Sequence, residues 1–496
     1  MKGFGNNEIK KSFSANEVVR EKFKKEAFEA YQRGNINYAI QCFENCIKNG
    51  FHDPKFFSQY GIILYKSGFI TKAINILEQS ILIYPNETEL FINLGNIFKL
   101  IGDFKKAEKY IKKSYELSPK SSTVLTNLSS IYIEQKKLYD ARKFALLSHK
   151  ADLNKPEPLY NLGIIYSKLY FYKEACFYFK ETLKRDKKSY PANLNLGAVL
   201  LKLDRLDEAQ KYLNVALSLN PNSYEAFFNL GQIALYKNKF KESESYFIKS
   251  LNQCKNNYEI YQYLGIAQFL NSNFNALENI DKAISLNPKV NISHVLKNLI
   301  KVDYASKDSE KYINNNPYDN FGNDPIILHR NIEEELINTL YKKNTSDLNH
   351  IESNPHSGNA IGSDYFLFEE KNIVLDTLQN DLKEITSKCF NSEIFIKDAF
   401  FRILQGEGKV DKHIHIGLID MIKGLNLYKK KFSLVYYLKT GDQNCSDPGN
   451  LRFYNPDKQI LPKPGMIIIF PSDRPHSVVY NGKSDRMILS INFYCY

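Results

Sequence analysis

The chain has 496 residues, 43% of them hydrophobic, which is too long for one core and predicts two or three domains. Its net charge is +12, but Lys and Arg are spread along the sequence rather than gathered in an arm, so a nucleic-acid partner is not favoured. Seven scattered Cys, no CxxC pair and no long apolar run predict free thiols, no membrane span and a cytoplasmic location.

Residues 1–19 are expected to form an N-terminal tail, after which small residues recur every 34 positions. One series is Gly61, Gly95, Ser129, Gly163, Gly197, Gly231 and Gly265. A second series, twelve residues further on in each repeat, begins earlier and contains Ala39, Ala73, Ala107, Ala141, Ala175, Ala209 and Ser243. Two antiparallel helices approach closely only where side chains are small, so each repeat should be a helical hairpin.

Turn and end signals support this interpretation, because Gly68 and Gly102 fall between the paired helices and several Pro residues mark repeat ends. The pattern resembles the tetratricopeptide repeat (TPR), with about eight units over residues 20–290. The resemblance implies an all-α solenoid that binds a partner.

Asn recurs two residues before the small residue of the first series. These positions are Asn93, Asn127, Asn161, Asn195 and Asn229. They should face the concave groove, where an amide can pair with a polypeptide backbone without reading its side chains. The row is similar to the one in the repeats of O-linked N-acetylglucosamine transferases, which hold extended polypeptides. Alternatively, each Asn bonds a neighbouring repeat or water.

The 34-residue period is lost after about residue 290. Residues 291–325 are predicted to form a cap and linker, with a capping helix over 295–302. The remainder, 326–496, is predicted to be an α+β domain with leading helices over 329–343 and 371–390. In the second of these helices, the apolar face is expected to contain Ile373, Leu375, Leu378 and Leu382.

From about residue 398 the hydrophobic period changes to two, which is typical of strands. The predicted strands are 398–405, 432–439, 450–455, 465–472, 476–481 and 486–496. Glycine- and proline-containing turns separate them. Antiparallel strands preceded by helices favour a double-stranded β-helix, or jelly roll.

Three histidines and an arginine in these strands predict a site. His413 and His415 point to the same side of an extended segment, and His476 opens a later strand after a tight loop. Three imidazoles at a barrel mouth suit a divalent metal, with iron(II) or zinc as candidates. Arg486 should face the same interior as Ser490, and a buried guanidinium there suits a carboxylate.

The segment 398–496 resembles the Fe(II)/2-oxoglutarate-dependent dioxygenases, in particular their prolyl-hydroxylase-like branch. The resemblance implies that His413 and His476 bind iron. It also implies that Arg486, with Ser490 beside it, anchors the co-substrate 2-oxoglutarate, and that Tyr437 assists. The chain would then be a hydroxylase whose TPR groove brings a polypeptide substrate to the jelly roll.

His415 departs from the family pattern, because a carboxylate normally occupies its position in the His-x-Asp pair. Either His415 completes a three-histidine site, or Asp411 or Asp420 substitutes, or the metal function is lost. In the last case the chain would be a non-catalytic TPR scaffold with a degenerate metal-binding jelly roll. The substrate and the hydroxylated atom stay open.

Overall fold

The computed structural model describes residues 21–51, 53–308, 324–343, 346–347, 358–362, 367–369 and 371–496. The expected tail at 1–19 and the linker residues 309–323 lie outside the described residues. The chain divides into two compact units, 1–219 and 220–496.

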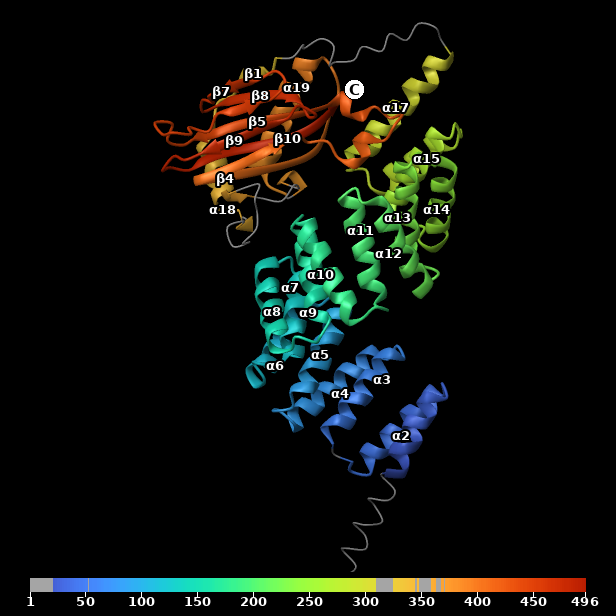
Figure 1. Ribbon diagram of the computed structural model, residues 1–496. Coiled ribbons are helices and arrows are strands. Elements are labelled where there is room, and N and C mark those ends of the chain that lie inside the picture. The colour runs from blue at the N-terminus through green and yellow to red at the C-terminus, as the bar shows by residue number, and fades with distance from the viewer. Residues whose placement is uncertain are drawn as a thin grey trace, which may run out of the picture. The chain divides into compact units, whose positions relative to one another are not determined.

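The first unit is a succession of antiparallel helix pairs (Figure 1). After a helix over 21–32, its helices are α2 (Ile36–Lys48), α3 (Pro54–Lys66), α4 (Ile70–Ile83), α5 (Thr88–Leu100), α6 (Phe104–Leu117), α7 (Ser122–Glu134), α8 (Leu138–Ala151), α9 (Glu157–Lys168), α10 (Tyr172–Arg185), α11 (Tyr190–Lys202) and α12 (Leu206–Leu219). The small residues lie where paired helices touch. A Cβ added to Gly163 in α9 would lie 2.5 Å from the Phe179 ring in α10. The predicted TPR solenoid is confirmed.

The turn inside each hairpin contains one residue with positive φ, again at a spacing of 34. The first three are Gly34, Gly68 and Gly102, as the turn signal predicted for the last two. The later ones are Lys136, Tyr170, Asp204, Asn238 and Ser272, with φ between 57° and 64°. A side chain with a Cβ is disfavoured in this left-handed conformation, so the later repeats keep the turn at an energetic cost.

Replacing Lys136 by Gly should therefore stabilise the first unit by about 1 kcal/mol, because Gly adopts positive φ without a steric penalty. Urea unfolding measures the change. Lys143→Gly inside α8 is the matched control, and it should cost about 1 kcal/mol, since Gly lowers helix propensity. Equal destabilisation by both changes would contradict the turn assignment.

The second unit begins with five more helices, α13 (Tyr224–Tyr236), α14 (Phe240–Gln253), α15 (Tyr258–Leu270), α16 (Ala276–Leu286) and α17 (Asn291–Asp308). The capping helix α17 is longer than the predicted 295–302. These helices share a hydrophobic core with the sheet that follows. Leu264 and Ala267 of α15 belong to the same buried cluster as Phe395 and Tyr494. The last repeats are therefore part of the structural support of the sheet.

In the part of the chain that the structure describes, ten strands form one sheet, and all their pairings are antiparallel. They are β1 (Ile326–His329), β2 (Ser346–Asp347), β3 (Gly358–Gly362), β4 (Ile394–His413), β5 (Lys431–Thr440), β6 (Leu451–Phe453), β7 (Lys458–Ile460), β8 (Met466–Pro471), β9 (His476–Tyr480) and β10 (Arg486–Cys495). The order is β1-β8-β5-β10-β4-β9-β6-β7, with β3 also on β4. The first half of β4 pairs with β10 and its last residues pair with β9, so β4 joins the two walls of a jelly roll.

The two faces of this sheet pack against different elements. One face packs with α18 (Glu334–Lys342) and α19 (Ile373–Phe390) in a shared core. The other face, which includes Tyr437 and Ile488, packs against β6 and β9 inside the barrel. Leu375, Leu378 and Leu382 are buried as predicted, but Ile373 is 80% exposed because it is the first residue of α19, beyond the sheet contact.

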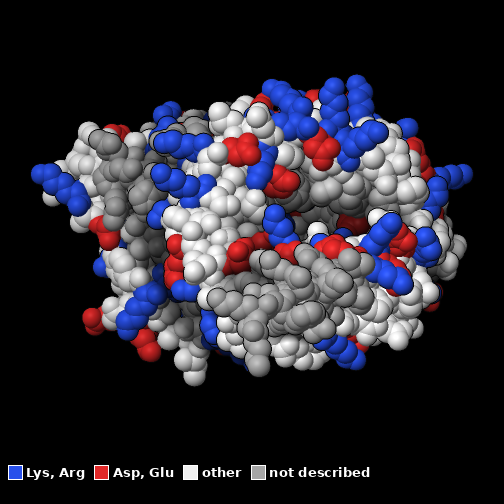
Figure 2. Space-filling view, turned by 90° about the horizontal axis from the view of Figure 1, so that it is seen from below, with Lys and Arg blue, Asp and Glu red and all other residues white. Residues whose placement is uncertain are grey.

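Charged side chains of both signs are interspersed on the face of the molecule shown in Figure 2. On this face, acidic residues lie among the basic ones. In the part of the chain that the structure describes, no helix combines the length and apolarity needed to span a bilayer.

Candidate metal centre

Strand geometry brings the three histidines together at one end of the barrel. His413 is the last residue of β4 and His476 the first of β9, and the two residues are paired directly across the ladder. His415 lies just beyond β4, where its backbone N–H donates to the Ser472 carbonyl at 2.8 Å. Antiparallel pairing thus brings His415 and His476, which are 61 positions apart in the sequence, into one site.

The three imidazoles converge closely enough to share a metal ion. Their candidate ligand atoms all lie within 4.8 Å of one another. The Nε2 atoms of His415 and His476 are 3.2 Å apart, and the ring centroids of His413 and His476 are 4.3 Å apart. These separations suit bonds of about 2.1 Å from imidazole nitrogens to one divalent ion.

Backbone carbonyls orient two of the three rings. The Nδ1 of His413 lies 2.8 Å from the Asp411 carbonyl, and the Nδ1 of His476 lies 3.1 Å from the Arg474 carbonyl. With the proton on Nδ1, each ring offers the Nε2 lone pair to a metal, as is usual for metal-bound histidine. His415 differs, because its Nδ1 faces the Nδ2 of Asn492 at 3.5 Å.

Burial keeps the imidazoles of His415 and His476 neutral. Desolvation, reinforced by the charge of His413, lowers the pKa of His476 to about 3. Burial and the neighbouring His476 and His413 hold the pKa of His415 well below its usual range. Neutral imidazole is the form that binds metals, so at neutral pH no proton has to leave these two rings.

Arg486 is a buried cation on the same interior face. It is 1% exposed, and its guanidinium lies 5.2 Å from the centroid of the Tyr437 ring. One nitrogen, Nη1, donates to the Pro448 carbonyl at 3.4 Å, while Nε of Arg486 and Oη of Tyr437 are buried and find no hydrogen-bond partner among the described residues. Buried polar atoms are normally satisfied, so this pair is suited to a polar ligand.

The surroundings of Arg486 fit one end of a dicarboxylate. Gly449, with φ +84°, leaves space for the guanidinium, since a Cβ at this position would lie 1.6 Å from Nη1 of Arg486. Ser490, four residues further along β10, is also buried. A carboxylate at this position would accept from Arg486 and Tyr437 and neutralise the buried charge. The residues present therefore fit 2-oxoglutarate as well as a metal.

Neither candidate aspartate joins the histidines. Among the described residues, the group able to hold a metal consists of the three imidazoles alone. Both oxygens of Asp420 are engaged elsewhere, one by Tyr494 and the other by Lys431 and the Gly417 N–H. The carboxylate of Asp411 lies 3.4 Å from Lys409 Nζ. The arrangement thus favours His415 over either carboxylate as the third ligand.

The row of asparagines is half-buried or buried, and several of its amides bond the preceding repeat. Asn93 donates to Ser58 Oγ at 2.6 Å, Asn161 to the Thr126 carbonyl at 3.2 Å and Asn195 to Tyr160 Oη at 3.0 Å. Asn127 and Asn229 are half-buried. For these three residues, the amide therefore bonds a neighbouring repeat, which was the alternative to peptide binding. An amide group can, however, make more than one bond.

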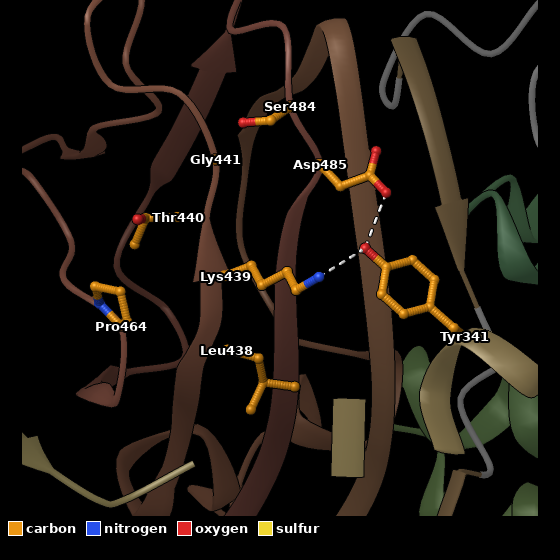
Figure 3. Close-up of a pocket in the computed structure, with 8 residues that line it drawn as sticks. All are labelled: Tyr341, Leu438, Lys439, Thr440, Gly441, Pro464, Ser484 and Asp485. Atoms are coloured by element: carbon orange, nitrogen blue, oxygen red, sulfur yellow. Dashed lines mark hydrogen bonds between the residues drawn. The ribbon is translucent and has the colours of Figure 1, made fainter. Parts of the chain in front are cut away.

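A surface pocket of about 430 Å³ lies elsewhere in the second unit (Figure 3). Tyr341 Oη donates to Asp485 at 2.9 Å and accepts from Lys439 Nζ at 3.3 Å across it. None of the three histidines lines this pocket. It is therefore separate from the candidate metal centre.

Comparison with known protein families finds both the repeats and the C-terminal domain. A family model described as tetratricopeptide repeat matches residues 172–233, and a second matches 88–121 and 224–257. The 2OG-Fe(II) oxygenase superfamily model matches residues 401–494, which include the three histidines, Tyr437 and Arg486. No curated protein matches the chain.

Several solved structures are similar. The APC/C hetero-tetramer Cut9–Hcn1 shares 18% identity, covering 49% of this chain and 48% of its own, at a TM-score of 0.45. YrrB, a TPR protein described as having an unusual peptide-binding site, shares 25% identity over 38% and 97% of the two chains, at 0.33. A TPR protein from Parabacteroides merdae shares 11% over 51% and 99%, at 0.43. This chain spans about half the length of the Cut9–Hcn1 chain. The chain combines tetratricopeptide repeats with a C-terminal domain of the 2OG-Fe(II) oxygenase superfamily.

Proposed function

We propose that the chain is an Fe(II)- and 2-oxoglutarate-dependent hydroxylase whose repeats bind a polypeptide substrate. The observation that carries the proposal is the convergence of three imidazoles, two of them kept neutral by burial, at the mouth of a barrel that also buries a partly unsatisfied arginine. When bound, the iron and 2-oxoglutarate would supply the oxidising power for C–H hydroxylation. The protein supplies the binding, orientation and exclusion of water.

Each residue has a separate task in this proposal. His413 and His476 hold the metal through Nε2, because backbone carbonyls fix their Nδ1 protons. Arg486 and Tyr437 hold the distal carboxylate of 2-oxoglutarate in a dry pocket, where such bonds are strong. Ser490 lies on the same strand and contributes a hydroxyl to that end of the site.

His415 is the third ligand in this proposal. Its Nε2 lies 3.2 Å from the Nε2 of His476, so both atoms face the same position for a metal. A neutral third ligand leaves the site one negative charge short of the His-x-Asp pattern, so metal binding should be weaker than with a carboxylate. The site must then rely on the accuracy with which His415 is placed.

A polypeptide is the substrate class that the repeats suggest, since TPR arrays mostly bind protein segments. Binding in the repeats would raise the effective concentration of a target residue at the barrel. The bonds made by Asn93, Asn161 and Asn195 within the array leave the carbonyl oxygens of these amides to accept from a bound backbone.

The test is succinate release from 2-oxoglutarate by the purified full chain under air, with Fe(II) and a library of unstructured peptides. We expect peptide-stimulated succinate that disappears when iron is replaced by zinc. No succinate above a protein-free control, with or without peptides, would refute the proposed activity. Anaerobic metal analysis of the same sample then shows whether the centre holds metal without turnover, as in a scaffold protein.

Changing His415 to Asp should tighten metal binding by about tenfold, because it restores a negative ligand to a dicationic site. Anaerobic titration with Co(II), followed by its visible absorption, measures the dissociation constant. His415→Asn is the matched control, since it has the same size as Asp but no charge, and it should bind more weakly than the wild type. If the Asp and Asn variants bind equally, position 415 does not contact the metal.

A further inference from the structure

We infer that the buried ion pair Asp420–Lys431 is a positioning device for His415, which goes beyond the proposed function but rests on it. Asp420 lies in the segment that connects β4 to β5, and Lys431 is the first residue of β5. This segment, residues 414–430, is named the His415 loop below. Neither member of the pair is able to reach the metal, because both are bonded to protein groups.

Lys431 clamps the backbone of His415 directly. Its ammonium donates to the His415 carbonyl at 2.6 Å and to Asp420 at 2.7 Å, and its side chain is fully buried. The backbone N–H of His415 is held by the Ser472 carbonyl at 2.8 Å. The backbone N–H and carbonyl of His415 are thus both hydrogen-bonded, which leaves its imidazole little freedom to move away from His476.

Asp420 also anchors the His415 loop. Its Oδ2 accepts from the Gly417 N–H at 2.8 Å as well as from Lys431, and its Oδ1 accepts from Tyr494 Oη on β10. The carboxylate therefore links the loop to two strands of the sheet. Gly417 is two residues from His415, so this bond fixes the chain direction immediately after the imidazole.

The terminal repeats pack against the His415 loop. Ile422, Leu425 and Leu427 are buried in the core cluster that also contains helix α15. Gly424 has φ +98°, and a Cβ there would lie 2.8 Å from a methyl group of Leu270, the last residue of α15. The buried apolar residues of the loop are therefore packed between the repeats and the sheet.

Such a device is needed at position 415 more than at the other two. His413 and His476 belong to strands and are paired with each other in the ladder. His415 lies after the end of β4, where no strand pairing fixes the backbone. A buried ion pair is a poor source of stability, but in some proteins such a pair selects one geometry. The placement of Asp420 and Lys431 therefore matches a role in orienting the third imidazole.

The first experiment compares Co(II) affinity of the full-length wild type, Lys431→Met and the exposed control Lys429→Met. Lys431→Met should raise the dissociation constant by about tenfold to a hundredfold, the usual effect of losing an outer partner of a metal ligand. Lys429→Met should leave it unchanged. The same substitution in a His415→Ala background should change the constant by less than about twofold, because the group it positions is absent.

The double variant Asp420→Leu/Lys431→Met covers the case in which the single variant does not fold. It removes both charges together, so no unpaired charge is left in the core. We expect it to fold and to bind Co(II) as weakly as Lys431→Met. Wild-type affinity in a folded Lys431→Met or double variant, or an equal loss in the His415→Ala background, would overturn the positioning role.

A measurement without metal separates this inference from the proposed function. In protein labelled with ¹⁵N at histidine, the ring signals of His415 should broaden or split in Lys431→Met, while those of His413 and His476 stay as in the wild type. Unchanged His415 signals would overturn the inference. If the wild type binds no Co(II), the proposed metal function fails, and the ring signals alone decide whether the ion pair orients His415.

Discussion

Replacing His476 by Ala is expected to abolish metal binding, with a loss of more than about a hundredfold in Co(II) or Fe(II) affinity, and to stop succinate formation. His476 is nearly fully buried, and its neutral ring is fixed by the Arg474 carbonyl with Nε2 directed into the site. A two-ligand site that keeps only His413 and His415 lacks one donor of a facial set. Anaerobic Co(II) titration and a succinate assay measure the two losses.

His329→Ala is the matched control, because His329 lies in the same unit but is exposed, with its Nε2 near the Pro464 carbonyl. It should leave metal affinity and turnover unchanged. Since His476 also contacts the Phe470 ring, circular dichroism must show that the His476→Ala variant is folded. A folded variant with wild-type affinity would show that the metal, if any, binds elsewhere.

The helical part of the fold could be predicted because its signal repeats. A single Gly or Ala is weak evidence, but small residues every 34 positions mark the helix contacts in one repeat after another. The strands β4, β5, β8, β9 and β10 were also recognisable from alternation and turns. By contrast, β1 and β7 have four and three residues, too few for a period to appear, and no sequence pattern indicated them.

The candidate site was predictable only in part, for a physical reason. His413, His415 and His476 could be singled out because histidine is rare here and its spacing on strands is restrictive. Asp420 was predicted only as a candidate metal ligand and Lys431 was not predicted at all, since in sequence they look like the many other charged residues, and their burial depends on the packing of the loop against β10 and α15. A lysine that opens an otherwise apolar strand, as in KFSLVYYL, was the one local signal available.

The second large effect is expected at Arg486. Changing it to Leu should weaken 2-oxoglutarate binding by at least about thirtyfold, because losing one partner of a buried charged pair costs about 2–5 kcal/mol. Co(II) affinity should stay within about twofold of the wild type, since Arg486 contacts Tyr437 and Pro448 rather than the histidines. Isothermal titration calorimetry of the Co(II)-loaded protein measures co-substrate binding directly.

A purely structural arginine would behave differently, and thermal unfolding without co-substrate shows the difference. Burial lowers the pKa of Arg486, and its Nε has no partner, so the free protein carries an incompletely compensated charge in its core. Arg486→Leu should therefore keep or raise the melting temperature while it removes 2-oxoglutarate binding. Arg486→Lys should bind at an intermediate level, because an ammonium keeps the charge but not the forked geometry. A Leu variant that unfolds readily and binds 2-oxoglutarate normally would contradict the assignment, since Arg486 would then act in packing and the dicarboxylate would need another cation.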